Sequence, residues 1–172
     1  MKVKLIAGTL LLLTVFVVLL VYAVSSMTVQ RLILCATDNS QSAVPSAVCK
    51  YYLENHGIDG EAVRDLQAGA GLEFILNIES PSRFELAERF IEQGLDVNGI
   101  NHYSSQNSAP LHAVIMYGDL DSVKFLIAKG ALLSVKNKSG ETALQLAEWL
   151  FDQNNLNGQA IISQLALAES RL

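Results

Sequence analysis

The feature that most constrains this chain is a long apolar run near its amino terminus. No charged side chain occurs from Leu5 to Val24, and the nearest charges on either side of this run are Lys4 and Arg31. About 20 apolar residues in a helix cross the hydrocarbon core of a bilayer, which is roughly 30 Å thick. The run has this length and therefore predicts a membrane-spanning helix.

Two other interpretations of the run stay open. A secretory signal has an apolar stretch of roughly 7–15 residues before a small-residue cleavage site, and the sequence VYA that ends at Ala23 is a passable site. A buried helix of a soluble protein is the other. If the run is a retained anchor, Lys2 and Lys4 keep the amino terminus in the cytoplasm. We then expect a single-pass protein of the inner (cell) membrane whose carboxy-terminal domain lies outside the cytoplasm, in the periplasm of a bacterium. Cleavage would instead give a secreted protein.

The chain beyond the run is acidic. It carries 10 of the 12 Lys and Arg residues and all 17 Asp and Glu residues, a net charge of −7. Nucleic acids and anionic lipid head groups bind basic surfaces. We therefore expect no nucleic-acid partner.

Two cysteines, Cys35 and Cys49, both follow the apolar run. An even number of cysteines in an oxidising compartment permits a disulfide, and closing a loop of this length adds roughly 3 kcal/mol in the chain-entropy description. Cys49 is equally interpretable as a small buried apolar residue. Both readings stay open.

Composition divides the chain into three parts. Residues 1–34 form the predicted anchor, and residues 35–46 form a linker because they are mostly polar and include Pro45. Residues 47–172 have helical spacing of apolar side chains. Pro81 and Pro110 suit the first turn of short helices, and Gly94 and Gly118 suit helix ends.

The short helices repeat along the chain. RFELAERFIEQG superimposes on the later DLDSVKFLIAKG, which places Phe90 on Leu126. SAPLHAV superimposes on ETALQLA, which places Leu111 on Leu144. The second shift equals a period of about 33 residues, and such a period with helix–turn–helix content is typical of a solenoid repeat.

On these segments, the chain resembles the ankyrin-repeat family, whose unit is a turn followed by two antiparallel helices. APLHAVIMYGDLDSVKFLIAKGA is similar to the family's two helices and the Gly turn between them, and the likeness extends from Ser82 to Trp149. The resemblance implies an all-α solenoid of about three repeats, with degenerate first and last repeats, and we expect this solenoid to follow the single transmembrane helix that the apolar run predicts. It also implies that Leu111 and Leu126 lie in the core and that His112 makes hydrogen bonds between turns.

The sequence departs from the family pattern at several places. Ala109 and Ala143 replace the usual Thr and Pro, and Gln145 stands where the family has His. The segment from Gly99 to Asn107 is longer than the standard turn needs. Insertions of this kind map to the rim of a solenoid, where binding often occurs.

The sequence offers no catalytic set. His56, His102 and His112 do not stand at metal-ligand spacing from one another or from a cysteine. The Gly69-Ala70-Gly71 segment is too short for a phosphate-binding loop. We expect no enzyme activity, no metal, no cofactor and no small-molecule substrate.

The resemblance implies binding to another protein through the turn tips and the ends of the first helices. Tyr and Trp at such places often carry much of the binding free energy. We expect Tyr103 and Tyr117 to face the same side, and Trp149 and Leu150 either to contact the partner or to pack against the carboxy-terminal helix. Tyr103 is a candidate because it lies in the inserted segment, and the positions implied by the resemblance are Ser105, Gln106, Ser108, Met116, Tyr117, Lys138, Ser139, Glu141 and Trp149.

These features favour a non-catalytic binding module that its amino-terminal helix holds at the membrane. A narrower hypothesis is an immunity protein that neutralises a toxin or hydrolase acting in the periplasm or at the membrane. A third is a structural subunit of an envelope complex, in which the span itself packs against other helices. The identity of the partner is not encoded in any motif.

Overall fold

The computed structural model describes residues 2–37, 42–106 and 108–171. These residues form ten helices, and no strand occurs among them. The predicted all-α class is confirmed over this part of the chain. The contacts divide the chain into a first unit, Met1–Ile58, and a repeat unit, Asp59–Leu172.

The first unit begins with one long helix, α1 (Lys2–Ser25). It is the one helix in the described residues that is long and apolar enough to cross a membrane. Its apolar side chains from Leu10 to Val21 are largely exposed. Length and composition alone make it a candidate span, and a signal sequence near an amino terminus has the same properties.

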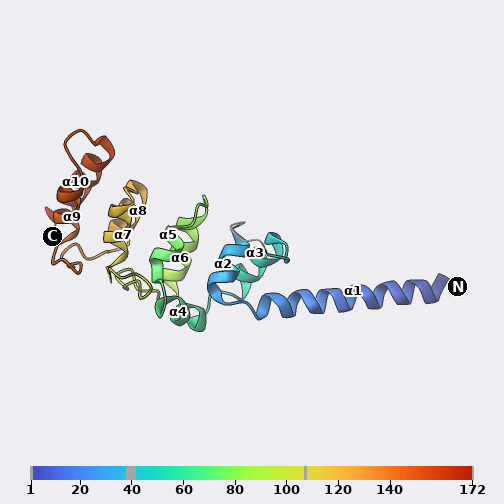
Figure 1. The fold of residues 1–172 in the computed structure, drawn as a ribbon. Helices are drawn as coiled ribbons and strands as arrows, with labels where there is room; N and C mark the ends of the chain where they lie inside the picture. The colour runs from blue at the N-terminus through green and yellow to red at the C-terminus, as the bar shows by residue number, and fades with distance from the viewer. Residues whose placement is uncertain (1, 38–41, 107, 172) are drawn as a thin grey trace. The chain divides into compact units, whose positions relative to one another are not determined.

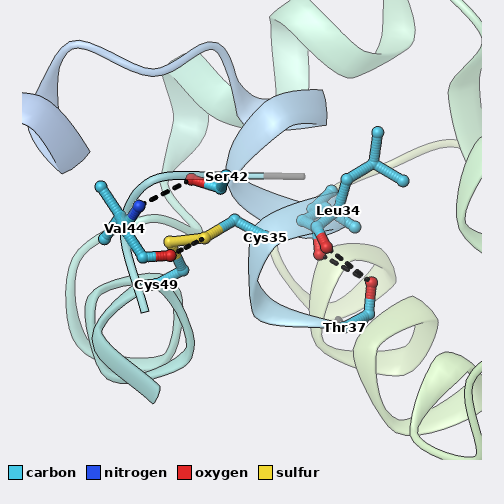
Figure 2. The surroundings of a disulfide bond; sticks show 7 residues. Leu34, Cys35, Thr37, Ser42, Val44 and Cys49 are labelled. Carbon is cyan, nitrogen blue, oxygen red and sulfur yellow. Dashed lines mark hydrogen bonds between the residues drawn. A yellow bond between two sulfur atoms is a disulfide. The ribbon is translucent and has the colours of Figure 1, made fainter. Parts of the chain in front are cut away.

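Two short helices, α2 (Val29–Ala36) and α3 (Ser46–Asn55), pack against each other in the first unit. A disulfide joins Cys35 to Cys49, whose Cα atoms are 5.7 Å apart, and both residues are buried (Figure 2). The carbonyl oxygen of Val44 lies 3.6 Å from the Cys35 sulfur. The cysteines therefore close a small helical hairpin.

The hairpin differs from the predicted division of the chain. We expected a linker over residues 35–46 and a repeat domain from residue 47, but the contacts place α3 with α2 and put the boundary after Ile58. The physical reason is the disulfide, which spans the expected linker, together with close packing at Gly57. A Cβ atom on Gly57 would lie 2.9 Å from the Leu53 Cα atom. Residues 38–41 of the expected linker lie outside the described residues.

The repeat unit consists of a single helix followed by three helix pairs. Within each pair the helices contact each other, and first helices contact first helices of the next pair (Figure 1). The elements are α4 (Gly60–Gln67), then α5 (Gly71–Leu76) with α6 (Arg83–Glu92), α7 (Pro110–Met116) with α8 (Leu120–Ala128), and α9 (Ala143–Leu150) with α10 (Leu156–Glu169). This is the expected paired architecture.

The helix boundaries follow from local chemistry. Pro110 occupies the first position of α7, where its missing N–H costs nothing. Asp119 caps α8, because its carboxylate accepts a hydrogen bond from the Ser122 backbone N–H at 3.1 Å. Thr142 and Gln145 form a reciprocal capping box at the start of α9. Gly118 has a φ of +68°, which lets the chain turn from α7 into α8.

The core of the repeat unit lies between neighbouring pairs. Leu111 and Leu126 are buried, as the sequence predicted, and Phe90 and Ile161 are fully buried on either side of them along the chain. One pair has too little apolar surface to form a core alone, so each pair completes the core of its neighbour. The packing of successive helix pairs determines which turns and helix ends remain exposed to solvent.

Candidate interaction surfaces

The turns that precede α7 and α9 form the first candidate surface. We call it the tip surface and define it by five exposed residues, Tyr103, Ser105, Gln106, Lys138 and Ser139. Tyr103 is 76 % exposed. The ammonium group of Lys138 donates a hydrogen bond to the Ser105 carbonyl at 3.1 Å, so the two turns lie together.

The long loop of the tip surface is fixed on the turn between α4 and α5. The backbone N–H of His102 donates to the Gly69 carbonyl at 2.9 Å, and the N–H of Asp96 donates to the Gln67 side chain at 3.0 Å. The ring of Tyr103 lies against Gly69, where an added Cβ atom would be 2.9 Å from a ring carbon. The long loop is therefore held in place by His102 and Tyr103, and the segment that leads into it is held by Asp96.

A buried carboxyl group lies beneath this loop. Glu73, the third residue of α5, is buried and hydrogen-bonds the Asn101 side chain. Its Oε2 atom has no hydrogen-bond partner among the described residues. Burial raises the pKa of Glu73 above its ordinary value, and the Asn101 hydrogen bond only partly opposes this. Glu73 therefore binds its proton more tightly in the fold than in the unfolded chain.

His112 occupies the same third position in α7. Its Nε2 atom is 3.2 Å from the Glu141 carbonyl oxygen in the turn of the next repeat, as the expected role between turns requires. Burial lowers the pKa of His112, while the Glu141 carbonyl and carboxylate oppose that shift. Gln145 is third in α9, so the three first helices carry Glu, His and Gln at equivalent positions. Superimposing SAPLHAV on ETALQLA places His112 on Gln145. The same superposition gives no sign that Glu73 holds the equivalent position in α5.

The far ends of the first helices form the second candidate surface. We call it the helix-end surface and define it by exposed apolar and aromatic side chains at the carboxyl ends of α7 and α9 and the start of α10. Its members are Met116, Tyr117, Trp149, Leu150 and Leu156. Trp149 is 75 % exposed and Leu156 is 85 % exposed. Trp149 therefore does not pack into the carboxy-terminal helix, which was one of the two expectations for it.

The two expected tyrosines lie at opposite ends of the first helices. Tyr103 contacts Gly69, just before α5 begins. Tyr117 is the residue at which α7 ends. At 1.5 Å per residue, the length of α7 separates its ends by about 10 Å. The two tyrosines therefore lie near opposite ends of the first helices, and the expectation that they face the same side stays a prediction.

Two other expected contact positions are not free surface. Ser108 is only 4 % exposed, because it leads directly into the buried start of α7. Glu141 is half-buried, and its carboxylate accepts a hydrogen bond from the Asn137 side chain at 2.9 Å. Both residues therefore belong to the turn structure. Met116 and Tyr117 are exposed, as a contact role requires.

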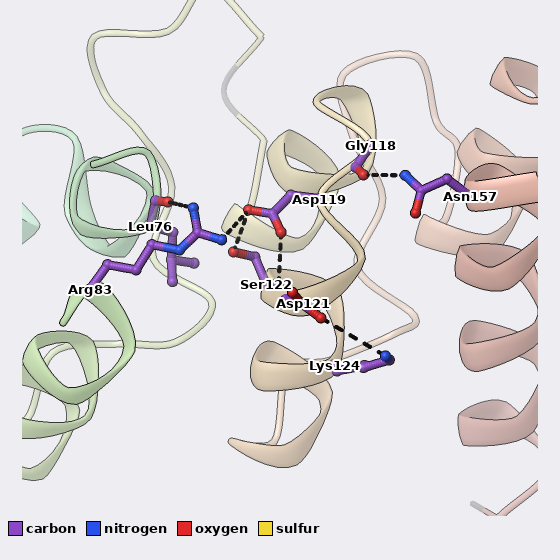
Figure 3. A network of polar contacts seen from close by, with 8 residues as sticks. All are labelled: Leu76, Arg83, Gly118, Asp119, Asp121, Ser122, Lys124 and Asn157. Atoms are coloured by element: carbon purple, nitrogen blue, oxygen red, sulfur yellow. Dashed lines mark hydrogen bonds and ion pairs between the residues drawn. The ribbon is translucent and has the colours of Figure 1, made fainter. Parts of the chain in front are cut away.

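Polar contacts join the helix-end turns of successive repeats. The Arg83 guanidinium donates to the Asp119 carboxylate at 2.9 Å and to the Leu76 carbonyl at 3.3 Å (Figure 3). The Asn157 side chain donates to the Gly118 carbonyl at 2.6 Å, which ties the start of α10 to the turn after α7. These contacts could not be predicted from the sequence, because charged and amide side chains do not contribute to the apolar periodicity that locates the helices.

Among the described residues, no group of three His, Cys, Asp or Glu side chains is arranged to hold a metal ion. His102 is an exposed residue of the tip loop, and His112 is committed to the Glu141 carbonyl. The two candidate surfaces carry exposed aromatic, apolar and charged side chains that could contact another protein.

Two comparisons with known proteins identify the repeat. The family described as ankyrin repeats (many copies) matches residues 111–149, which include α8 and all but one residue each of α7 and α9. A segment of 48 residues is 40 % identical to the transient receptor potential cation channel subfamily A member 1 homolog of Caenorhabditis elegans. That segment is 28 % of this chain and 4 % of the channel homolog, so the likeness concerns a small part of that protein. Over residues 111–149 the chain is therefore similar to ankyrin repeats, and the stacked helix pairs have the paired-helix architecture expected of such repeats.

Proposed function

We propose that this protein is a non-catalytic binding module for another protein, held at a membrane by α1, with its repeat unit outside the cytoplasm. The observation that carries the proposal is the combination of an exposed apolar helix with ankyrin repeats that leave aromatic side chains uncovered. Ankyrin repeats are protein-binding units. A membrane-held repeat unit would raise its effective concentration toward a partner in the same compartment.

The membrane part of the proposal rests on α1. A helix of 24 residues is about 36 Å long, which exceeds the hydrocarbon thickness of roughly 30 Å. The exposed side chains from Leu10 to Val21 would lie in lipid. Lys2 and Lys4 favour a cytoplasmic amino terminus. A disulfide in the first unit fits the oxidising side of a membrane.

Membrane attachment is tested by washing membranes at alkaline pH and by fusing a reporter after residue 172 that is active only outside the cytoplasm. We expect the full chain to stay in the membrane fraction and the reporter to be active. Release of a shortened chain into the soluble extracytoplasmic fraction would contradict the anchor and favour cleavage after Ala23.

Binding is tested by placing a photo-activatable amino acid at Tyr117 or at Tyr103 in the full chain, in native membranes. The matched control places it at Glu92, a residue of α6 outside both surfaces. We expect a discrete adduct from at least one tyrosine position and none from Glu92. The substitution Trp149→Ala should reduce a Tyr117 adduct, and Gly69→Ala should reduce a Tyr103 adduct. Equal labelling at all three positions would contradict a defined binding surface.

A narrower form of this function is neutralisation of a toxin or hydrolase at the membrane. The repeat unit contains fifteen acidic and eight basic side chains, a net charge of −7, and a compact acidic binder suits a cationic target. Deleting the gene should then increase sensitivity to a toxin encoded beside it. Unchanged sensitivity would leave binding intact and remove the immunity role.

A further inference from the structure

The helix-end surface consists of exposed apolar side chains from neighbouring helices. Met116 and Trp149 hold equivalent positions, one repeat apart, on α7 and α9, which contact each other. The Asn157 side chain donates a hydrogen bond to the Gly118 carbonyl (Figure 3), and Leu156 and Tyr117 are the chain neighbours of these two residues. Exposed aromatic and aliphatic side chains gathered in this way are typical of an interaction site.

The charges around this surface have one predominant sign. The segments 77–83, 116–124 and 148–157 contain five acidic side chains and two basic ones, a net charge of −3. Arg83 pairs with Asp119 at 2.9 Å, so these two charges neutralise each other within the fold. Lys124 lies 3.9 Å from the Asp121 carboxylate. Glu148 and Asp152 are exposed on either side of Trp149 along the chain.

The segments around the tip surface carry no net charge, unlike those around the helix-end surface. The segments 96–106 and 132–142 contain two acidic and two basic side chains, a net charge of zero. Tyr103 is its single exposed aromatic residue among the described positions. The negative charge and the larger apolar area therefore coincide at the helix ends and not at the tips.

We propose that the helix-end surface binds a cationic, arginine-bearing segment of a protein partner; this rests on the proposed function and specifies the partner's chemistry. Guanidinium groups stack on the faces of Trp and Tyr rings and form two parallel hydrogen bonds with a carboxylate. Trp149 and Tyr117 supply the ring faces, and Glu148 and Asp152 supply the carboxylates. A second copy of this chain would bring like charges together, and anionic lipid would be repelled.

The test uses the full chain in nanodiscs of phosphatidylcholine. The probes are three short fluorescent peptides with the same leucine and phenylalanine positions, which differ only in having Arg, Gln or Glu between them. Fluorescence anisotropy gives each Kd, and empty nanodiscs measure binding to the lipid itself. We expect the Arg peptide to bind about tenfold more tightly than the Gln peptide at low salt, and this difference to shrink as NaCl screens the charges.

Charge-neutralising substitutions identify the surface. E148Q with D152N should weaken the Arg peptide by roughly three- to tenfold. Asn at 152 keeps a side-chain oxygen that can accept from the backbone N–H groups of Asn154 and Asn155, as Asp152 now does. The matched control, E92Q with E169Q, removes the same charge from positions elsewhere and should leave Kd unchanged. W149A should weaken binding by about thirtyfold, a loss typical of a dominant contact.

Three results would overturn the inference. These are equal Kd values for the Arg and Gln peptides, tighter binding of the Glu peptide, and equal effects of the two double substitutions. Binding of the Arg peptide to empty nanodiscs alone would make lipid its target and would equally overturn it. A Tyr117 adduct in membranes together with any of these results would leave the proposed function standing with a partner of different chemistry.

Discussion

The two units of this protein are stabilised in different ways. The α2–α3 hairpin of the first unit has few residues and a covalent link between Cys35 and Cys49. The repeat unit has no cysteine, and its helices bury leucine, isoleucine and phenylalanine side chains against neighbouring pairs. A short hairpin cannot bury enough apolar area to order itself, whereas stacked pairs share one continuous core. Core substitutions and reduction should therefore affect different units.

The largest expected effect is the loss of a core side chain in the repeat unit. Leu111→Ala should lower the free energy of unfolding of this unit by roughly 2–5 kcal/mol, because it removes buried methyl groups and leaves a cavity. Hydrogen exchange of the full chain measures the change by segment. Amides of α7 to α10 should exchange faster, while those of α2 and α3 stay unchanged. Uniform acceleration in both units would contradict their separate stabilisation.

Removing the disulfide should have the next largest effect, confined to the first unit. The two cysteines have a sequence separation of 14, and closing a loop of that size contributes about 3 kcal/mol. The double substitution Cys35→Ala and Cys49→Ala should accelerate exchange in α2 and α3 and leave α7 unchanged. Thiol labelling of the denatured, unreduced parent chain should find no free thiol. Two labelled thiols would contradict the disulfide.

A smaller effect is expected from the hydrogen bond between His112 and the Glu141 carbonyl. His112→Ala should cost about 1 kcal/mol or more, and His112→Gln should restore part of this, since a side-chain amide can also donate a hydrogen bond to the Glu141 carbonyl. Because the pKa of His112 is lowered in the fold, the unfolded chain binds the proton more readily. Stability should therefore be complete above about pH 6.5 and fall as the pH drops below it. Denaturation of His112→Gln across this range should show a weaker decline.

His112→Ala also separates structure from recognition. A folded variant that still forms the Tyr117 adduct fits a role between the turns. A variant as stable as the parent that forms no adduct would instead make His112 a contact residue.

The smallest effect, with the opposite pH dependence, is expected at Glu73. Its pKa is raised in the fold, so the folded state holds the proton more tightly than the unfolded state. The contribution of Glu73 should be most favourable below about pH 4.5 and decline as the pH rises through the raised pKa. Glu73→Gln keeps a neutral side chain that can hydrogen-bond Asn101, and it should flatten this part of the stability profile. Lower stability of Glu73→Gln at neutral pH would show that the carboxylate itself is required.

Much of the repeat unit was predictable because its apolar residues recur with a fixed period. The spacing of Leu111 and Leu126 and the Pro and Gly residues around α7 and α8 locate the core and the turns correctly. The first unit was less predictable. Pro45 and its polar neighbours are typical of a linker, and two cysteines alone do not distinguish a disulfide from two buried thiols.

The candidate surfaces were predictable only in part. The expected contact positions included Tyr103, Tyr117 and Trp149, which are exposed, but they also included Ser108, which the start of α7 buries. Leu156 was missed because an isolated leucine at a helix start is normally interpreted as core. Glu73 was missed because a carboxylate in the family's histidine position has no apolar period and becomes recognisable only when α5 is placed beside Asn101.

The contacts that fix the tip loop have a consequence for association kinetics. Tyr103 rests on Gly69, and His102 is bonded to the Gly69 carbonyl, before any partner arrives. A partner that docks there meets a loop whose conformational entropy was already lost during folding, so less of the contact free energy is spent on ordering it. Binding at the tips would resemble the meeting of two rigid bodies, with an association rate limited by diffusion and orientation and not by loop rearrangement.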